Sequence, residues 1–185
     1  MYRLLGFAGL CLAGAAPIWC QDFLKREVFG SIGIGKTYDD EGSLGQGLNG
    51  GGGFGYRLTH RFGVEAEVNA FRTRRDFSSA FAPFQASGAL VLGNGLLYLN
   101  RGRGQVYLIG GAGLLHVRNR VRFGGVPLNR TDRGLAVGLG IGVKIFATKH
   151  FVLRPDARIY GGNSGSAVEA AFTDLRFSMG AGYCW

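Results

Sequence analysis

A phosphate-binding pattern stands near the start of the sequence. Residues 30–37, Gly-Ser-Ile-Gly-Ile-Gly-Lys-Thr, match G-x-x-x-x-G-K-[ST] at every position. In nucleotide-binding proteins this loop joins a strand to a helix, whose amide groups hold the phosphates. Here Val28, Ile32 and Ile34 share one parity, as in a strand, and residues 38–53 hold seven glycines and no apolar helical stripe. The pattern therefore predicts a strand and no nucleotide site.

Other residues capable of catalysis are few and scattered. His60, His116 and His150 show no spacing with serine and acid that suggests lipid hydrolysis. Together with Cys184 they form no metal-ligand cluster. We expect a protein without catalytic residues, metal or cofactor; a barrel enzyme that modifies lipid A is the more remote alternative.

Ionised side chains recur at alternate positions of otherwise apolar segments. Because successive side chains of a strand point to opposite faces, residues of one parity share a face. Acids and bases on that face can form a ladder of ion pairs if the strands bring them together, since a buried charge is tolerable only when paired. The predicted set is Glu65, Glu67, Lys144, Arg154, Asp156, Arg158, Asp174 and Arg176, with Arg57 on the same parity.

Large apolar residues alternate with small or polar ones through almost the whole chain after residue 27. In 135–145 every odd position is Leu, Val or Ile, and the even positions are Ala, Gly or Lys. Weaker or similar alternation predicts strands over 28–36, 51–58, 62–70, 84–98, 105–118, 151–160 and 175–185, eight in all. In 105–118 we place Tyr107, Ile109, Leu115 and Val117 on the large apolar face. In 84–98 the alternation breaks near residues 93–95, which suggests a β-bulge.

The composition is that of a membrane protein without membrane helices. Mean hydropathy is +0.11 and only 18% of residues are charged, yet no segment beyond the N-terminus has the ~20 apolar residues of a spanning helix. Glycine is high at 34 of 185, without a collagen period. We predict an all-β, eight-stranded antiparallel up-and-down transmembrane β-barrel. Its large apolar face contacts lipid, and its glycines and ions line the lumen; a soluble barrel with the faces inverted is the competing interpretation.

Connections of two lengths alternate along the chain. Short ones are predicted at 59–61, 100–104 and 147–150, and long ones at 37–50, 73–83, 119–132 and 161–170. Outer-membrane barrels have short periplasmic turns and long outer loops. Aromatic residues beside the short turns predict an interfacial girdle. They are Tyr56, Phe62, Tyr98, Tyr107, Phe146, Phe151, Tyr183 and Trp185.

The first 20 residues have the pattern of a signal peptide. A basic start at Arg3 precedes an apolar run over 4–16, and the sequence turns polar at Gln21. We therefore expect export and a barrel domain over 21–185. Without residues 1–20 the chain keeps 20 basic and 12 acidic residues, a net charge of +8, and one cysteine, Cys184, which excludes an internal disulfide.

Over residues 27–185 the chain resembles the small eight-stranded outer-membrane barrels of the outer-membrane-protein β-barrel-domain type, which include the OmpA transmembrane domain and OmpX. The most specific element is the alternating, aromatic-ending stretch Leu175–Trp185. The resemblance implies that this strand is read by the barrel-assembly machinery, a role that would fall on Phe177, Tyr183 and Trp185. It also implies residence in the bacterial outer membrane.

Arginines are concentrated near the long connections. Arginine pairs well with phosphate, so we expect contacts with lipopolysaccharide, and no nucleic-acid partner because stacking aromatics are missing. The expected residues are Arg72, Arg74, Arg75, Arg118, Arg120, Arg122 and Arg130. We predict a monomeric outer-membrane barrel with a structural or surface-interaction role and a plugged lumen. A small channel or ligand-binding barrel is the main alternative.

Overall fold

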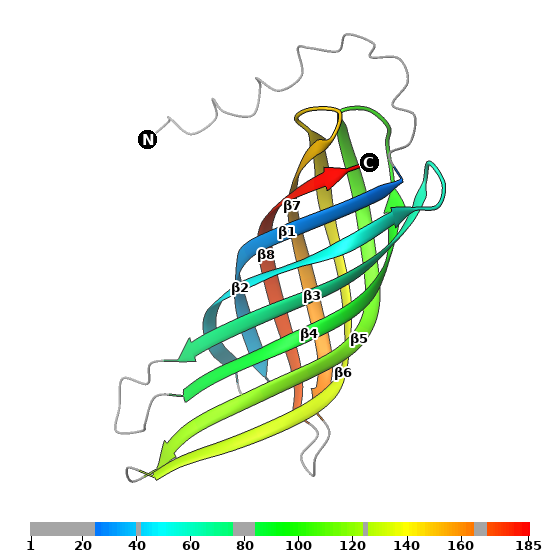
Figure 1. The fold of residues 1–185 in the computed structure, drawn as a ribbon. Coiled ribbons are helices and arrows are strands. Elements are labelled where there is room, and N and C mark those ends of the chain that lie inside the picture. Colours follow the sequence, from blue (N-terminus) through cyan, green and yellow to red (C-terminus); the bar gives the residue numbers. More distant parts are fainter. Residues whose placement is uncertain (1–24, 40–41, 76–83, 124–125, 165–169) are drawn as a thin grey trace, which may run out of the picture.

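Eight antiparallel strands close into one barrel in the computed structural model (Figure 1). The structure describes residues 25–39, 42–75, 84–123, 126–164 and 170–185, so the predicted signal peptide lies outside the described residues. Each strand pairs with its sequence neighbours, and β1 pairs with β8, which confirms the predicted fold class. The strands are β1 (Arg26–Asp39), β2 (Gly42–Arg57), β3 (Phe62–Arg75), β4 (Phe84–Tyr98), β5 (Gly104–Phe123), β6 (Val126–Phe146), β7 (Phe151–Ser164) and β8 (Ala170–Cys184). Within these described ranges no helix is long and apolar enough to cross a membrane.

The outward rows of six strands are apolar, as predicted. On β6, Leu135 and Leu139 are exposed, whereas Ala136 and Lys144 point inward and are buried. The same division holds on β1, β2, β3, β7 and β8. Large aliphatic side chains in continuous exposed rows suit contact with hydrocarbon rather than water.

The predicted orientation of β5 is wrong, and β4, for which no face was predicted, has the same arrangement. Tyr107, Ile109 and Leu115 of β5 face the lumen, not the outside, and Leu92 of β4 lies with them in the interior. Two apolar clusters result. The lumen of this barrel is therefore apolar on one side and ionic on the other. Buried side chains in the two clusters are Leu90, Leu92, Leu115, Ala136 and Tyr160, and Leu96, Tyr98, Tyr107 and Ile109.

The apparent break near residues 93–95 is a consequence of this orientation and not a β-bulge. The register of β4 with β3 and β5 runs without a shift through Asn94. Gly93 and Gly95 point outward, while Asn94 lies inward among leucines. Apolar and polar residues therefore stop alternating here, although successive residues still point inward and outward in turn. The register shift that does occur lies between Thr37 and Tyr38, where β1 pairs with β2.

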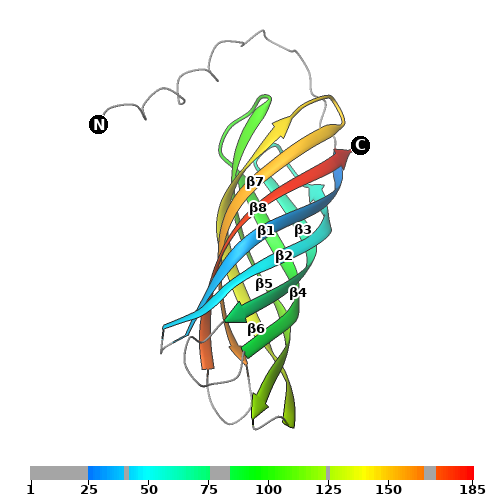
Figure 2. The same ribbon diagram turned by 90° about the vertical axis from the view of Figure 1, so that its left-hand side faces the viewer.

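The strands run much further into the predicted long connections than expected. β1 and β2 occupy 37–39 and 42–50, and β5 and β6 occupy 119–123 and 126–132. Backbone pairing therefore continues beyond the apolar rows. β5 and β6, with 20 and 21 residues, extend furthest at the end of the barrel that carries the predicted long connections, which we call the long-strand end (Figures 1 and 2). The three short connections lie together at the opposite end, where the C-terminus is also found (Figure 1).

The phosphate-loop pattern lies inside a strand, as predicted. Residues 30–37 pair on one side with β2 and on the other with β8. Their backbone amides serve the sheet ladder, so they cannot form the cradle that phosphate binding requires. Lys36 points outward, and its ammonium group lies 5.1 Å from the centre of the Tyr38 ring.

Candidate functional site

Arg154 of β7 forms the centre of an ion-pair network inside the barrel. Its Nη1 donates a hydrogen bond to Glu27 Oε1 at 3.1 Å, and its Nη2 donates to Glu65 Oε2 at 2.8 Å. Lys144 of β6 donates to the other carboxylate oxygen of Glu27. The ring centre of Phe29 lies 3.9 Å from the guanidinium carbon and covers it. Arg154 is only 1% exposed, so its charge depends on these partners for compensation.

A second group of ion pairs surrounds Arg158, two inward positions further along β7. Arg158 donates to Glu67 Oε2, and its Nη2 lies 3.0 Å from Asp156 Oδ2 and 3.8 Å from Glu65 Oε1. The hydroxyl of Tyr107 donates to Asp156 Oδ2 at 3.3 Å. Glu65 therefore links the two groups, because it contacts both arginines.

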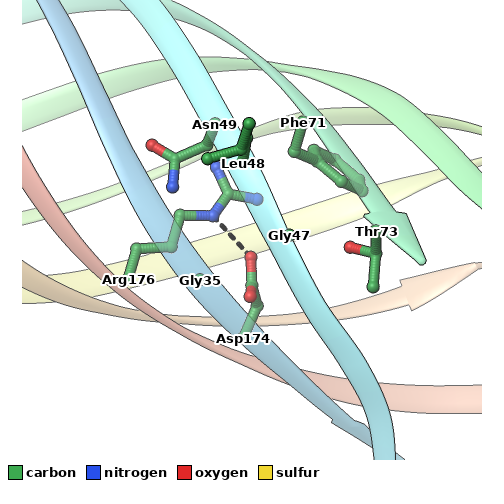
Figure 3. Close-up of a pocket in the computed structure, with 8 residues that line it drawn as sticks. All are labelled: Gly35, Gly47, Leu48, Asn49, Phe71, Thr73, Asp174 and Arg176. Carbon is green, nitrogen blue, oxygen red and sulfur yellow. Dashed lines mark hydrogen bonds and ion pairs between the residues drawn. The ribbon is translucent and has the colours of Figure 1, made fainter. Parts of the chain in front are cut away.

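The third pair joins Arg176 and Asp174 near the start of β8, towards the long-strand end of the lumen; Figure 3 shows its surroundings. Arg176 Nε donates to Asp174 Oδ2, and its Nη1 donates to Asn69 Oδ1 at 3.2 Å. A cavity of about 10 Å³, roughly the size that one water molecule needs, lies beside the buried amide of Asn49, whose side-chain atoms have no hydrogen-bond partner among the described residues. Such a space excludes an organic ligand. Its lining is Gly35, Gly47, Leu48, Asn49, Phe71, Thr73, Asp174 and Arg176.

The structure brings all eight residues of the expected ladder together inside the barrel. Every one of them takes part in a salt bridge. Glu65 and Glu67 reach arginines of β7, whereas Arg176 of β8 contacts Asp174 and Asn69.

Sequence reasoning missed Glu27 as the partner of both Arg154 and Lys144. Its parity, opposite to that of Val28 and Ile32, indicates an inward position, but the predicted strand began at residue 28, two residues after the start of β1, and so left Glu27 out. Arg57, expected on the inward face, donates to Gln105 and lies 3.9 Å from the centre of the Tyr98 ring.

Outward-facing arginines gather near the long-strand end. Arg72 on β3 and Arg118 on β5 flank Ser87 of β4 in the register, and all three are exposed. Arg133 of β6 pairs across from His116 of β5, two residues from Arg118. Among the other expected contacts, Arg74, Arg75, Arg120, Arg122 and Arg130 lie in strands, and their side chains are outside the described set.

The aromatic girdle is partly corrected. Phe62, Phe151, Tyr183 and Trp185 are exposed beside the short turns, as expected, but Tyr98 and Tyr107 are buried in the lumen. Tyr183 stacks on Trp185 with ring centres 6.1 Å apart, and the Phe54 ring lies 6.2 Å from Trp185. Phe177, the third residue of the expected assembly signal, also faces outward from β8. Tyr183, Trp185 and Phe54 form an outward aromatic cluster, which covers the seam at which β1 pairs with β8.

The histidines do not converge. His60 and His150 lie in two different turns, and His116 faces outward from β5. Among the described residues no group of three His, Cys, Asp or Glu side chains is placed to hold a metal ion. Cys184 is a free thiol buried inside β8.

Comparison with known proteins decides the family. The family model of the outer membrane protein beta-barrel domain matches residues 4–183. The chain belongs to this family. The resemblance inferred from the terminal strand is thus confirmed. No curated protein matches the sequence significantly.

Solved structures agree with this outer membrane protein beta-barrel domain in fold. Neisserial surface protein A is 20% identical, with a TM-score of 0.61 over 86% of this chain and 97% of its own. Ail, the attachment invasion locus protein of Yersinia pestis, is also 20% identical, with a TM-score of 0.54 over 87% of this chain and 99% of its own. A major outer membrane protein of Thermus thermophilus gives a TM-score of 0.55 at 11% identity, over 85% of this chain and 99% of its own. These barrels share its architecture.

Proposed function

We propose that this protein is a monomeric outer-membrane barrel that serves as a closed structural and surface-interacting element, without catalysis. The observation that carries the proposal is the filled lumen. Arg154, Arg158 and Glu65 lie on its ionic side, and the two apolar clusters lie on the side of β4 and β5. The exposed apolar rows outside it suit hydrocarbon.

A closed lumen predicts that the barrel does not conduct. We expect the folded protein in planar lipid bilayers to show no steady ion conductance. Among the described residues, buried ion pairs and apolar side chains lie across the interior and obstruct a hydrated path. Stable conductance steps would favour the small-channel alternative, and activity on purified lipid A would favour an enzyme. Slower migration of boiled than of unboiled samples on gels verifies that the protein tested is folded.

The outward arginines support a contact with lipopolysaccharide phosphates. By strand spacing, Arg72 and Arg118 are separated by about 10 Å on the outer surface, with the hydroxyl of Ser87 between them. Their place beyond the apolar rows is where headgroup phosphates would lie if the long-strand end faces outward, as in barrels of this kind. Arginine binds such groups by paired, charge-assisted hydrogen bonds.

Removing these charges should weaken binding of lipopolysaccharide. For the triple variant Arg72→Gln, Arg118→Gln and Arg133→Gln, at about 1 kcal/mol per arginine, we expect a loss of affinity on the order of 100-fold at low salt. Titration of purified lipopolysaccharide against the folded protein measures it. When lipopolysaccharide is present only in the leaflet at the long-strand end, the matched variant Arg61→Gln, Arg101→Gln and Arg103→Gln, which removes three exposed charges at the other end, should bind normally. An equal loss of affinity in both variants would mean that net charge alone, and not the position of the arginines, determines binding.

A further inference from the structure

Two of the three short turns are built in the same way. In Leu58–Phe62, Thr59 Oγ1 accepts hydrogen bonds from the backbone amides of Arg61 at 3.2 Å and Phe62 at 3.0 Å. In 147–151, Thr148 Oγ1 accepts from the amides of residues 150 and 151 at 3.3 and 3.0 Å. The threonine fixes each turn so that the next two residues stand at its tip. Those residues are His60 and Arg61 in one turn, and Lys149 and His150 in the other.

The third turn is fixed by an asparagine. Asn100 Nδ2 donates to the carbonyl of Gly104 at 2.7 Å, and Asn100 Oδ1 accepts from the amide of Val106 at 2.6 Å. Gly102 has a φ of 123°, which side chains other than glycine rarely adopt, and it separates Arg101 from Arg103. Both arginines are exposed. The turn therefore holds two cations apart in a defined backbone.

These turns make one end of the barrel uniformly basic. Their sequences, 58–61, 99–103 and 147–150, contain no acidic residue. Desolvation and the positive charges of Arg101 and Arg61 lower the pKa of His60. Lys25 and Arg26 add to them at the start of β1. We call this set the basic rim; it comprises Lys25, Arg26, His60, Arg61, Arg101, Arg103, Lys149 and His150.

The basic rim lies at the level of the outward aromatic cluster. Arg26 exchanges two backbone hydrogen bonds with Trp185, at 3.1 and 3.0 Å, and pairs across from Tyr56. The ring of His150 stacks on Tyr183 with centres 5.5 Å apart. Aromatic side chains of membrane proteins sit at the depth of lipid headgroups. Cations interleaved with them are therefore beside the headgroups rather than far out in solvent.

We propose that the basic rim binds the phosphate groups of anionic phospholipids in the leaflet on the short-turn side. This proposal rests on the membrane placement given above. Lipid is favoured over a protein partner because Arg26 projects outward between aromatic residues that contact the bilayer, where phosphates surround the barrel on all sides. Each such cation adds to the attraction towards an anionic surface, and the attraction is strongest at low salt.

Quenching of Trp185 by brominated lipid tests the proposal. The full-length chain with Trp19→Phe has Trp185 as its single tryptophan. It is folded into phosphatidylcholine vesicles that contain a minor fraction of brominated phosphatidylglycerol or, separately, of brominated phosphatidylcholine. We expect the anionic lipid to quench at least about twofold more at equal fraction, and the preference to vanish in 1 M salt, where the screening length is about 3 Å.

A pair of matched variants assigns the preference to the basic rim. Arg26→Gln with Lys149→Gln removes two exposed rim charges near Trp185 and should abolish it; Arg72→Gln with Arg118→Gln removes two at the other end and should retain it. Equal quenching by both lipids in the parent, or a preference unchanged in the rim variant, overturns the proposal. So does binding to peptidoglycan sacculi without lipid preference, which would identify a cell-wall partner. Failure to insert into vesicles at all would instead overturn the proposed function.

A second measurement is independent of any substitution in the rim. Anion binding between the turns should raise the lowered pKa of His60. Its ring signals are followed by NMR against pH, in nanodiscs with and without phosphatidylglycerol. A higher pKa in the anionic nanodiscs supports the proposal, and an identical pKa in both contradicts it.

Discussion

Replacing Arg154 by methionine should lower the free energy of unfolding by about 3–5 kcal/mol. The guanidinium group is buried and compensates Glu27 and Glu65, at 3.1 and 2.8 Å. Without it, Glu65 keeps, among the described residues, only the longer contact to Arg158 at 3.8 Å, so a carboxylate is left poorly paired away from water. Equilibrium unfolding by guanidinium chloride, in vesicles that allow refolding, measures the loss.

Two variants separate this effect from simple truncation. Arg118→Met removes an exposed arginine and should change stability by no more than about 0.5 kcal/mol. Combining Arg154→Met with Glu65→Met removes both charges, so we expect it to recover more than half of the loss. A double variant as unstable as Arg154→Met would mean that packing, and not charge compensation, gives Arg154 its importance.

Replacing Leu92 by alanine should cost about 2–5 kcal/mol of stability. Leu92 is 2% exposed and belongs to the lumen cluster with Leu90, Leu115 and Tyr160. Neighbours on closed strands cannot move inward to fill the space, so the cavity adds to the lost transfer free energy. The same unfolding experiment measures it.

Leu97→Ala is the matched control, because it makes the same change on the outward face of the same strand. Lipid chains can fill the gap there, so its cost should be smaller by about 1 kcal/mol or more. Equal losses at both positions would show that the interior of β4 is not packed as the structure has it.

The ionic side of the lumen could be predicted because the two faces of its strands meet different surroundings, lipid outside and charged side chains inside. On β7 the charged Arg154, Asp156 and Arg158 alternate with apolar residues, so parity alone assigns them to the interior. Which acid meets which base could not be predicted. That depends on how far the strands are staggered when the sheet closes, and β3 lies across the barrel from β7 rather than beside it.

The chain by itself determined the number of strands, their antiparallel order and the faces of six of them, because alternation in polarity records which side meets lipid and which meets charge. Only the tertiary structure decided the faces of β4 and β5, the partner of Arg154 at Glu27, and the extension of β5 and β6 into the expected loops. On β4 and β5 both faces touch apolar surroundings, lipid outside and leucine or tyrosine inside. Apolar residues then stand on both faces, so alternation in hydrophobicity does not identify the inward face. Only the closure of the barrel determines which row of side chains points inward.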